Sequence, residues 1–295
     1  MSDAEALEAL LHGREPLWPP VERALFELWA ATAEPMRETL EASGTPAALR
    51  NYVESGADIL SPAEFDPYSS PARFVDELSQ LVEGGWLEAV GEGQYRVTAR
   101  ARSNVEAAMR AGDAHLETLG VLPAADLERH AALLERVVQA EPAPDAGALT
   151  RIRRCTSRLS RRRDDAHRAA WMTLDVPGHV WNAFTLIWHG DARNAIEVAA
   201  LQSFRGYTAS DYATAIEELV RRGWLEPDDV PGRYRASSTG TALRDEVEAR
   251  TDLYFYRPWS VLTDAEWEEL GACESRLRER LRDLRRSARQ VASRS

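Results

Sequence analysis

Apolar side chains recur at helical spacing in two stretches of this chain, and each stretch ends at a glycine. In residues 74–88 and 212–226 the apolar positions fall three and four residues apart, as on one face of an α-helix. Gly85 and Gly223 come three residues after the last apolar positions of these helices, Val82 and Val220. Glycine just beyond a helix readily adopts the positive φ that caps it. The pattern predicts two helices of the same kind. The apolar positions are Phe74, Leu78, Leu81 and Val82, and Tyr212, Ile216, Leu219 and Val220.

The two stretches also agree residue by residue when they are aligned without gaps. Each is followed by a polar turn and then by a Gly-x-Tyr-Arg segment, residues 93–96 and 232–235. Two short apolar segments around a polar tip are typical of a β-hairpin, so each helix is expected to lead into a small hairpin. The identical pairs are Leu81/Leu219, Val82/Val220, Gly85/Gly223, Trp86/Trp224, Leu87/Leu225 and Glu88/Glu226.

The agreement extends to both sides of these stretches. Downstream, residues 121–122 and 261–262 each precede a helix opened by a capping signal, which is clearest at residues 263–266. Upstream, the helix around Leu25 and Leu28 is similar to the one around Phe184 and Ile187, with roughly twenty extra residues in the first half. The order helix, helix, helix, hairpin, helix therefore occurs twice, which predicts an internal duplication.

The repeated unit resembles the winged helix of the MarR-like transcriptional regulators. The helix ending in Gly-Trp-Leu-Glu and the hairpin with Tyr-Arg on its second strand match the recognition helix and wing of that family. Residues 234–243 resemble the family's wing exit, with Gly240 at its glycine, and residues 262–281 resemble its closing helix. Residues 178–285 match better than residues 19–139, where Ala101 stands in place of Gly240.

The resemblance implies a mainly α fold with small β-wings, built from two winged-helix domains related by internal duplication. A segment rich in proline and alanine, residues 140–147, suits a boundary between the two halves. The expected organisation is an N-terminal extension (1–18), a first winged-helix domain (19–140), a linker with an arginine-rich helix (141–177) and a second winged-helix domain with a C-terminal helix (178–295).

The resemblance also implies which residues contact DNA. In the second half, Arg205-Gly206-Tyr207 forms the turn of a helix-turn-helix and Thr208 caps its second helix, whose N-terminal residues face base edges in such motifs. The implied base readers are Thr208, Ser210, Asp211 and Thr214; the implied phosphate contacts are Arg205, Arg221 and Arg222, with Arg233 and Arg235 on the wing. The first half offers Ser69, Ser70, Arg73 and Asp76, with Arg96, Arg100 and Arg102 near its wing.

Carboxylates on the same faces argue against DNA. Asp76, Glu77, Asp211 and Glu217 lie on or near the surfaces that would approach a polyanion, and several carboxylates together repel phosphate. The alternative interpretation is a winged-helix module that packs against proteins or senses a ligand and does not bind DNA.

Charge is divided unequally along the chain. The net charge is −12, but residues 1–150 hold 26 acidic and 11 basic residues, whereas the remaining residues hold 22 and 25. Every basic residue is arginine, whose planar fork suits phosphate and base edges, although a genome rich in G and C favours arginine codons equally. Residues 151–168 hold eight arginines. They form either a phosphate-contacting helix, with Arg161 and Arg162 as DNA contacts, or a counter-charge that docks on the acidic first half.

The remaining composition is that of an ordinary globular chain. Hydrophobic residues make up 44% and charged residues 28% of 295 residues, without an apolar run long enough to cross a membrane. The acidic N-terminus lacks the order of a signal peptide, and two cysteines without metal-ligand spacing fit a reducing cytoplasm. Six scattered histidines offer no metal site, and no catalytic motif or cofactor-binding loop is found, so we expect no cofactor, no metal and no enzymatic activity.

Aromatic residues suggest one further site. MarR-like regulators commonly bind an aromatic ligand in a cleft beside the DNA-binding part, and Trp188, Tyr254, Tyr256 and Trp259 would line such a cleft here. The alternative is that these side chains pack in the interdomain core. The sequence thus predicts a transcriptional regulator that binds double-stranded DNA as a pseudo-dimer, at a pseudo-palindrome read mainly by the second unit. A small aromatic effector and a homodimer are further expected partners.

Overall fold

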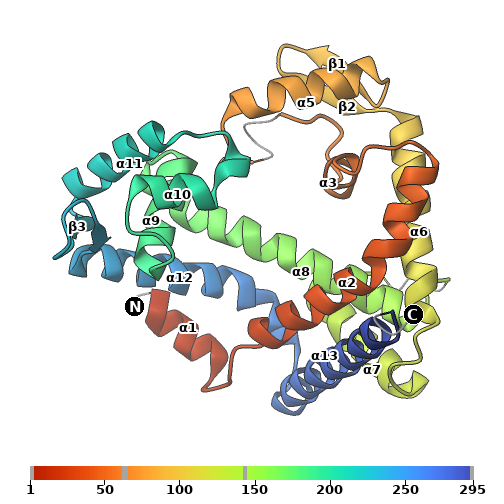
Figure 1. Ribbon diagram of the computed structural model, residues 1–295. Helices are drawn as coiled ribbons and strands as arrows, with labels where there is room; N and C mark the ends of the chain where they lie inside the picture. Colours follow the sequence, from red (N-terminus) through yellow and green to blue (C-terminus); the bar gives the residue numbers. More distant parts are fainter. Residues whose placement is uncertain (1–2, 62–65, 142–144, 293–295) are drawn as a thin grey trace. The chain divides into compact units, whose positions relative to one another are not determined.

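The computed structural model describes residues 3–61, 66–141 and 145–292 (Figure 1). The chain is mainly helical and carries two short antiparallel strand pairs. This confirms the expected mainly α fold with small β elements. The middle of the expected linker, residues 142–144, lies outside the described residues.

The chain divides into two compact units, and each unit draws segments from both halves of the sequence. Unit 1 comprises residues 1–47, 103–166 and 251–295, and unit 2 comprises residues 48–102 and 167–250. The domains expected from the sequence are contiguous ranges, whereas each compact unit combines separate segments. The expected domains stay predictions. The division into units falls within three helices, namely α6 (Ala99–Glu117), α8 (Ala148–Trp171) and α12 (Ser238–Tyr256).

Unit 1 is built on the packing of two long helices, α2 along α13. Pro19 and Pro20 lie in the first turn of α2, where proline's missing N–H group costs no helical hydrogen bond. Val21, Leu25 and Leu28 then recur at helical spacing and are buried. The helical elements of this unit, besides parts of α6, α8 and α12, are α1 (Asp3–Leu11), α2 (Trp18–Ala42), α7 (Ala124–Val138), η3 (Arg257–Val261) and α13 (Asp264–Ala292).

An aromatic cluster forms one part of the core of unit 1. Tyr256, Trp259 and Trp267 pack with ring centroids between 5.5 and 5.9 Å apart. The backbone N–H group of Trp18 donates a hydrogen bond to the Tyr256 hydroxyl at 2.8 Å. Burial raises the pKa of that hydroxyl above its ordinary value. The cluster therefore joins the start of α2 to the segment before α13.

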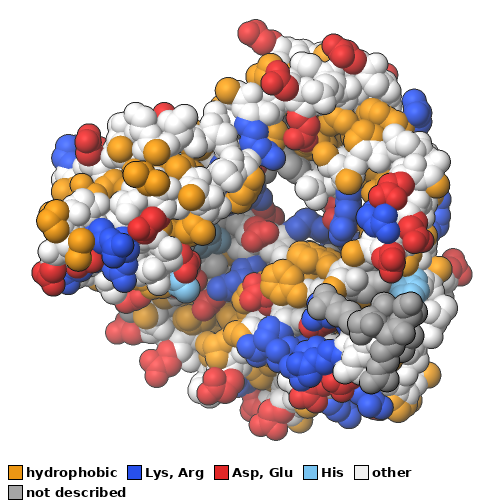
Figure 2. All heavy atoms as spheres, in the orientation of Figure 1, with side chains coloured by type: hydrophobic (Ala, Val, Ile, Leu, Met, Phe, Trp, Pro, Cys, Tyr) orange, Lys and Arg blue, Asp and Glu red, His pale blue; other side chains and the backbone are white. Residues whose placement is uncertain are grey.

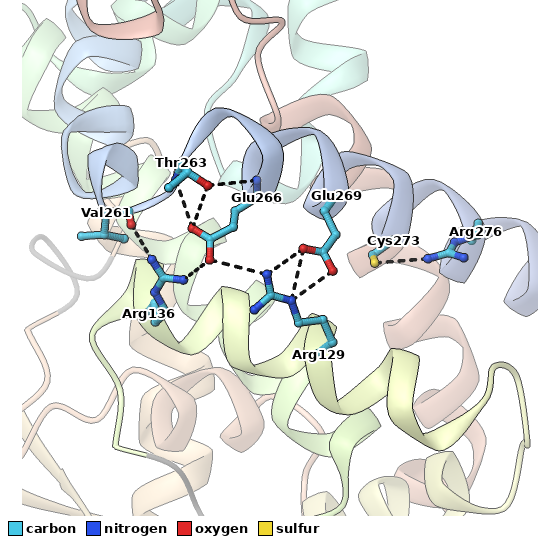
Figure 3. Close-up of polar contacts among 8 residues, drawn as sticks. All are labelled: Arg129, Arg136, Val261, Thr263, Glu266, Glu269, Cys273 and Arg276. Carbon is cyan, nitrogen blue, oxygen red and sulfur yellow. Dashed lines mark hydrogen bonds and ion pairs between the residues drawn. The ribbon is translucent and has the colours of Figure 1, made fainter.

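A network of ion pairs joins α7 to the start of α13 (Figure 3). Thr263 and Glu266 form the expected cap, since the Thr263 N–H group donates to Glu266 Oε2 at 3.0 Å and the Glu266 N–H group donates to Thr263 Oγ1 at 3.3 Å. Arg136 of α7 donates to the same carboxylate, and Arg129 donates to Glu269 at 3.0 Å. The hydrogen bond from Arg136, followed by those from Thr263, lowers the pKa of Glu266 to about 2.

Unit 2 contains the helices and hairpins of the two repeated stretches. The helices α9, α10 and α11 pack on one another. Trp181, Phe184, Tyr212, Ile216 and Leu219 supply buried side chains to their core. The elements are α3 (Leu49–Glu54), α5 (Pro71–Glu83), β1 (Leu87–Gly91), β2 (Gln94–Val97), η1 (Met172–Leu174), α9 (Gly178–His189), α10 (Ala195–Leu201), η2 (Ser203–Arg205), α11 (Ala209–Arg221), β3 (Leu225–Pro227) and β4 (Tyr234–Ala236).

Both expected hairpins are present, and each gains one more backbone partner. β1 pairs with β2, and β3 pairs with β4, both antiparallel. Leu60 exchanges two backbone hydrogen bonds with Tyr95 of β2, at 2.7 and 3.0 Å. In the second hairpin the Tyr234 N–H group donates to the Arg193 carbonyl at 2.8 Å. In both cases the partner lies upstream of the helix that leads into the hairpin.

The glycine that the resemblance singles out is required by close packing. A Cβ atom on Gly240 would lie 2.1 Å from the Trp224 carbonyl oxygen, which no side chain can tolerate. The start of α12 therefore lies directly against the backbone that opens β3. Gly85 and Gly223 have φ of 70° and 75°, as expected for the residues that end α5 and α11.

The sequence pairs the helix around Leu25 and Leu28 with the helix around Phe184 and Ile187, and the structure places these helices in different compact units. The pairing stays a prediction. α2 packs on α13, whereas α9 packs on α11. α3 and α9 share one feature, because each precedes the residue that pairs with a hairpin, Leu60 and Arg193 respectively. Apolar spacing alone could not distinguish two neighbouring helices.

Candidate nucleic-acid interface

The exposed face of α11 carries a row of polar side chains. Tyr212, Ile216 and Leu219 bury the opposite face. Ser210, Thr214, Glu217 and Arg221 are exposed, and their spacing of four, three and four residues places them on one side of the helix. Three of the expected DNA contacts, Ser210, Thr214 and Arg221, are thus brought together. Glu217 lies in the same row.

Thr208 and Asp211 form a capping box at the start of α11. The Thr208 N–H and hydroxyl groups both donate to Asp211 Oδ2 at 2.7 Å, and the Asp211 N–H group donates to Thr208 Oγ1 at 3.3 Å. These hydrogen bonds from Thr208 lower the pKa of Asp211. Both side chains are therefore engaged in starting the helix. Ser210 and Thr214 remain as the polar side chains nearest that end.

Glu218 holds both arginines at the end of α11. Arg221 Nε donates to Glu218 Oε2 at 2.9 Å, and Arg222 Nε donates to Glu218 Oε1 at 2.6 Å. The hydrogen bond from Arg221, then that from Arg222, lowers the pKa of Glu218. Arg222 also donates to the carbonyl oxygens of Leu174 and Asp175 at 3.3 and 3.1 Å. Arg222 is thus a structural contact, whereas the Arg221 side chain is 71% exposed.

The wing between β3 and β4 presents two arginines. Arg235 pairs across the hairpin with Glu226, with 2.7 Å between Nη2 and Oε1. Arg233 lies 3.8 Å from the Glu197 carboxylate. Both side chains are about half exposed, at 55% and 48%. An exposed ion pair of this kind is weak, so either guanidinium can exchange its carboxylate for a phosphate.

The helix α5 and its hairpin in the first half carry both acidic and basic side chains. Arg73 is exposed at the start of α5, with its guanidinium 5.2 Å from the Phe74 ring centroid. Arg96 lies opposite Glu88 in the hairpin. Asp76 is exposed as well, and Glu77 accepts a hydrogen bond from Tyr52 at 3.0 Å. Two further expected contacts are placed near the wing, Arg100 over the Trp86 ring at 3.9 Å and the partly exposed Arg102.

Arg205 does not lie on an open surface. Its side chain is 17% exposed, and Nη1 donates to Asp66 Oδ1 at 3.1 Å while Nε donates to Gln202 Oε1 at 2.7 Å. Its carbonyl oxygen accepts a hydrogen bond from the Ser70 N–H group at 2.8 Å. Ser69 is buried and donates to Asp66 Oδ2 at 2.5 Å. These contacts form a junction between the start of α5 and the turn before α11 (Figure 1).

The arginine-rich part of α8 contacts carboxylates and carbonyl groups within unit 1. Arg151 donates to Glu135 at 2.8 Å, and Arg153 donates to Asp113 at 2.7 Å. Arg162 donates to the carbonyl oxygens of Val137 and Val138, at 3.3 and 2.8 Å, at the end of α7. Arg161 is exposed. These contacts favour the interpretation of a counter-charge over that of a phosphate-contacting helix.

The four aromatic residues of the expected ligand site are divided between the units. Tyr256 and Trp259 are 1% and 0% exposed in the core of unit 1, where Tyr254 is 45% exposed. Trp188 lies in unit 2, with the Arg244 guanidinium 5.0 Å from its ring centroid. The packing of Tyr256 and Trp259 leaves no face of either ring for a ligand.

Hydrophobic side chains are exposed beside this candidate interface. Ile196 of α10 is 74% exposed, and Leu201 and Phe204 are also exposed. Figure 2 shows hydrophobic side chains spread over the part of the surface that α10, α11 and the wing form, among acidic and basic groups. An apolar surface of this kind does not bind phosphate, and it suits a protein partner better.

A model of a helix-turn-helix family matches residues 89–286, which is more than half of the chain. The chain belongs to this helix-turn-helix family. The matched range includes α9 to α11 and the second wing, whereas α5 precedes it. No curated protein and no solved structure matches the chain.

The described residues offer neither a metal site nor a membrane-spanning helix. No group of three or more His, Cys, Asp or Glu side chains in this part of the chain is arranged to hold a metal ion. None of the helices within residues 3–61, 66–141 and 145–292 is both long and apolar enough to cross a lipid bilayer.

The ion pairs of Glu218 and of Asp66 with arginines of this region were not predicted from the sequence. The pairing of Glu218 with Arg221 and Arg222 follows from spacings of three and four residues on one helix, so the signal was present. The pairing of Asp66 with Arg205 joins residues 139 positions apart, and no local pattern announces it.

Proposed function

We propose that this chain is a DNA-binding transcriptional regulator whose contact surface is α11 with the wing between β3 and β4. Membership of the helix-turn-helix family, with a match that includes this segment, is the observation that carries the proposal. In such motifs the second helix enters the major groove and its N-terminal part faces base edges. The proposal includes no catalytic step, no cofactor and no metal.

Each exposed side chain has a distinct role in this proposal. Ser210 and Thr214 face base edges from the N-terminal half of α11, where hydroxyl groups can donate or accept. Arg221, Arg233 and Arg235 contact phosphates, because their guanidinium groups are exposed and each is paired with a carboxylate that is itself partly exposed. Arg205 and Arg222 support the fold and are left out of the interface.

The experiment is duplex binding measured by fluorescence anisotropy at increasing salt, with DNA selected from a random library. Binding should weaken steeply with salt, because each phosphate contact releases counterions. Replacing Arg233 by Ala should weaken binding and lower the salt slope by about one contact. Arg110→Ala, which removes an exposed arginine of α6 in unit 1, is the matched control and should change neither. No duplex binding at low salt would overturn the proposal.

A second candidate function rests on the exposed apolar side chains of α10 and η2. Ile196, Leu201 and Phe204 would suit a protein partner, and the carboxylates of α5 and α11 would not disturb it. Ile196→Ser would weaken such an association and leave duplex binding unchanged. Arg233→Ala therefore tests DNA binding, and Ile196→Ser tests association with a protein partner.

We further propose that the two halves arose by internal duplication. The order of elements supports this, with α2, α3, α5, β1, β2, α6 and α7 corresponding to α8, α9, α11, β3, β4, α12 and α13. Leu60 and Arg193 play the same part, since each pairs with the second strand of a hairpin. The proposed regulator thus carries two winged-helix units in one chain and requires no second copy to present them. An aromatic effector is not part of the proposal.

A further inference from the structure

The N-terminal end of α5 and the turn before α11 are tied together by charged and backbone contacts. The Asp66 carboxylate accepts hydrogen bonds from Arg205 Nη1 at 3.1 Å, from Ser69 Oγ at 2.5 Å and from the Tyr68 N–H group at 3.0 Å. The Ser70 N–H group donates to the Arg205 carbonyl oxygen at 2.8 Å. The Arg205 guanidinium also lies 5.1 Å from the Tyr68 ring centroid. The half-buried pair of Asp66 and Arg205 is thus embedded in further contacts.

Two glycines allow the backbones to approach at this junction. A Cβ atom on Gly178, the first residue of α9, would lie 2.1 Å from the Pro67 carbonyl oxygen. A Cβ atom on Gly206 would lie 2.8 Å from Arg73 Cβ, and Gly206 has φ of 76°. Trp171 adds a hydrogen bond from Nε1 to the Tyr68 hydroxyl at 2.8 Å. Residues 66–73 therefore fit against the second helix-turn-helix closely, within one compact unit.

The junction sets an upper limit on the separation of the two helix starts. Ser70 precedes α5, and Thr208 follows Arg205 by three residues, so the two capping residues lie no more than about 15 Å apart. Helix-turn-helix dimers that read two half-sites place them about 34 Å apart, one turn of the duplex. The major groove itself is about 12 Å wide. The N-terminal ends of α5 and α11 are therefore too close together to enter two successive turns of the major groove.

The family match assigns α11, and not α5, to the groove. The matched range includes α11 and the second wing, whereas α5 precedes it. Net charge does not distinguish the two helices, because each carries one arginine and three carboxylates. α11 presents Ser210 and Thr214 with Glu217 and Arg221, and its wing adds two half-exposed arginines that can contact phosphates.

We infer that unit 2 binds a single asymmetric DNA segment through α11, with the junction of Asp66 and Arg205 closed, rather than a palindrome of two half-sites. This inference rests on the proposed function and specifies its DNA partner. It replaces the expectation from sequence that both winged-helix repeats engage a pseudo-palindrome. The junction residues position α11 and do not contact bases.

The first measurement is the symmetry of the selected DNA. The full chain is used to enrich random duplexes long enough for two half-sites, and the enriched sequences are compared. We expect one contiguous motif without an inverted repeat. An inverted repeat with half-sites one helical turn apart would overturn the inference and leave the proposed function standing. Failure to enrich any duplex would overturn the proposed function, and this inference with it.

The second measurement weakens the junction. Asp66→Asn removes the negative charge that Arg205 contacts, so the junction should open more readily. Because the closed junction positions α11, we expect the variant to bind the selected duplex several-fold more weakly than the wild type. Asp58→Asn, which removes an exposed carboxylate from the same unit, is the matched control. An unchanged affinity for Asp66→Asn, or enrichment of an inverted repeat by that variant as strongly as of a single motif, would overturn the inference.

Discussion

Arg153, in the arginine-rich part of α8, forms a buried ion pair with Asp113 of α6. Arg153 Nε lies 2.7 Å from Asp113 Oδ1, and the side chains are 4% and 10% exposed. Arg154 binds the other oxygen of the same carboxylate at 3.0 Å. The sequence left two interpretations of these arginines open, a phosphate-contacting helix and a counter-charge to the first half. At these positions they are internal partners of an acidic residue from the first half.

Removing one partner of this buried ion pair should lower the free energy of unfolding. Arg153→Ala leaves the Asp113 carboxylate buried with only the partly exposed Arg154, and breaking a buried pair in this way costs about 3 kcal/mol or more. Chemical denaturation measures the change in the free energy of unfolding. Arg161→Ala, at an exposed position of the same helix, is the control and should change it by less than about 0.5 kcal/mol. Equal effects of the two variants would contradict the assignment.

Substitutions of the aromatic residues of the expected ligand site should differ in their effect on the free energy of unfolding. Trp259 is fully buried among Tyr256, Phe255 and Trp267, so Trp259→Ala should lower the free energy of unfolding by about 3–5 kcal/mol. Tyr254 is exposed, and Tyr254→Ala should change it little. If Trp259 instead lined a ligand cleft, its truncation would cost little stability, and thermal unfolding would show that directly.

Glu218 should weaken DNA binding, because it neutralises Arg221 and Arg222. Glu218→Gln frees the exposed Arg221 guanidinium to meet a phosphate, so affinity for the selected duplex should rise by about two- to fivefold at low salt. Glu83→Gln is the matched control, since it removes one exposed carboxylate from α5 in the same unit and leaves α11 unchanged. Anisotropy titrations compare the two variants. A gain for Glu83→Gln as large as that for Glu218→Gln would attribute the effect to net charge.

Acid should weaken the capping network at the start of α13. The pKa of Glu266 is held at about 2 in the folded chain, below the ordinary value of 4.5. A lowered pKa means that the stabilisation is fully present above about pH 4.5 and is lost as pH falls toward 2. The Tm of the wild type should therefore approach that of Glu266→Gln over this range. Glu268→Gln removes a carboxylate from the same helix as a control, and a constant gap between wild type and Glu266→Gln would contradict the prediction.

Features governed by local chemistry could be predicted from the sequence. The apolar spacing of α5 and α11, the glycines at 85 and 223 and the cap formed by Thr263 and Glu266 all depend on residues within one or two turns of each other. The hairpins followed from short apolar segments around polar tips. The observed helices and hairpins have the expected types for this reason.

Contacts between distant residues could not be predicted in the same way. Apolar spacing shows that a helix buries one face but does not identify the helix that covers it, so the sequence could not show that α2 packs on α13 whereas α9 packs on α11. Basic residues near a turn look alike whether they meet phosphate or a carboxylate far along the chain. Arg205 and Arg221 are both arginines of the second helix-turn-helix, yet Asp66 holds the first within the unit and the second remains exposed.

The bare backbones of Gly178 and Gly206 give a test that can be applied to other sequences. A side chain at position 178 would collide with the Pro67 carbonyl, and one at position 206 would need both a strained φ and the space that Arg73 fills. Relatives with larger residues at both positions should hold α5 and the turn before α11 further apart. Under the proposed function, such chains have the reach to place these helices in successive turns of a duplex. The residues at positions 178 and 206 should therefore correlate with the symmetry of the DNA that each relative selects.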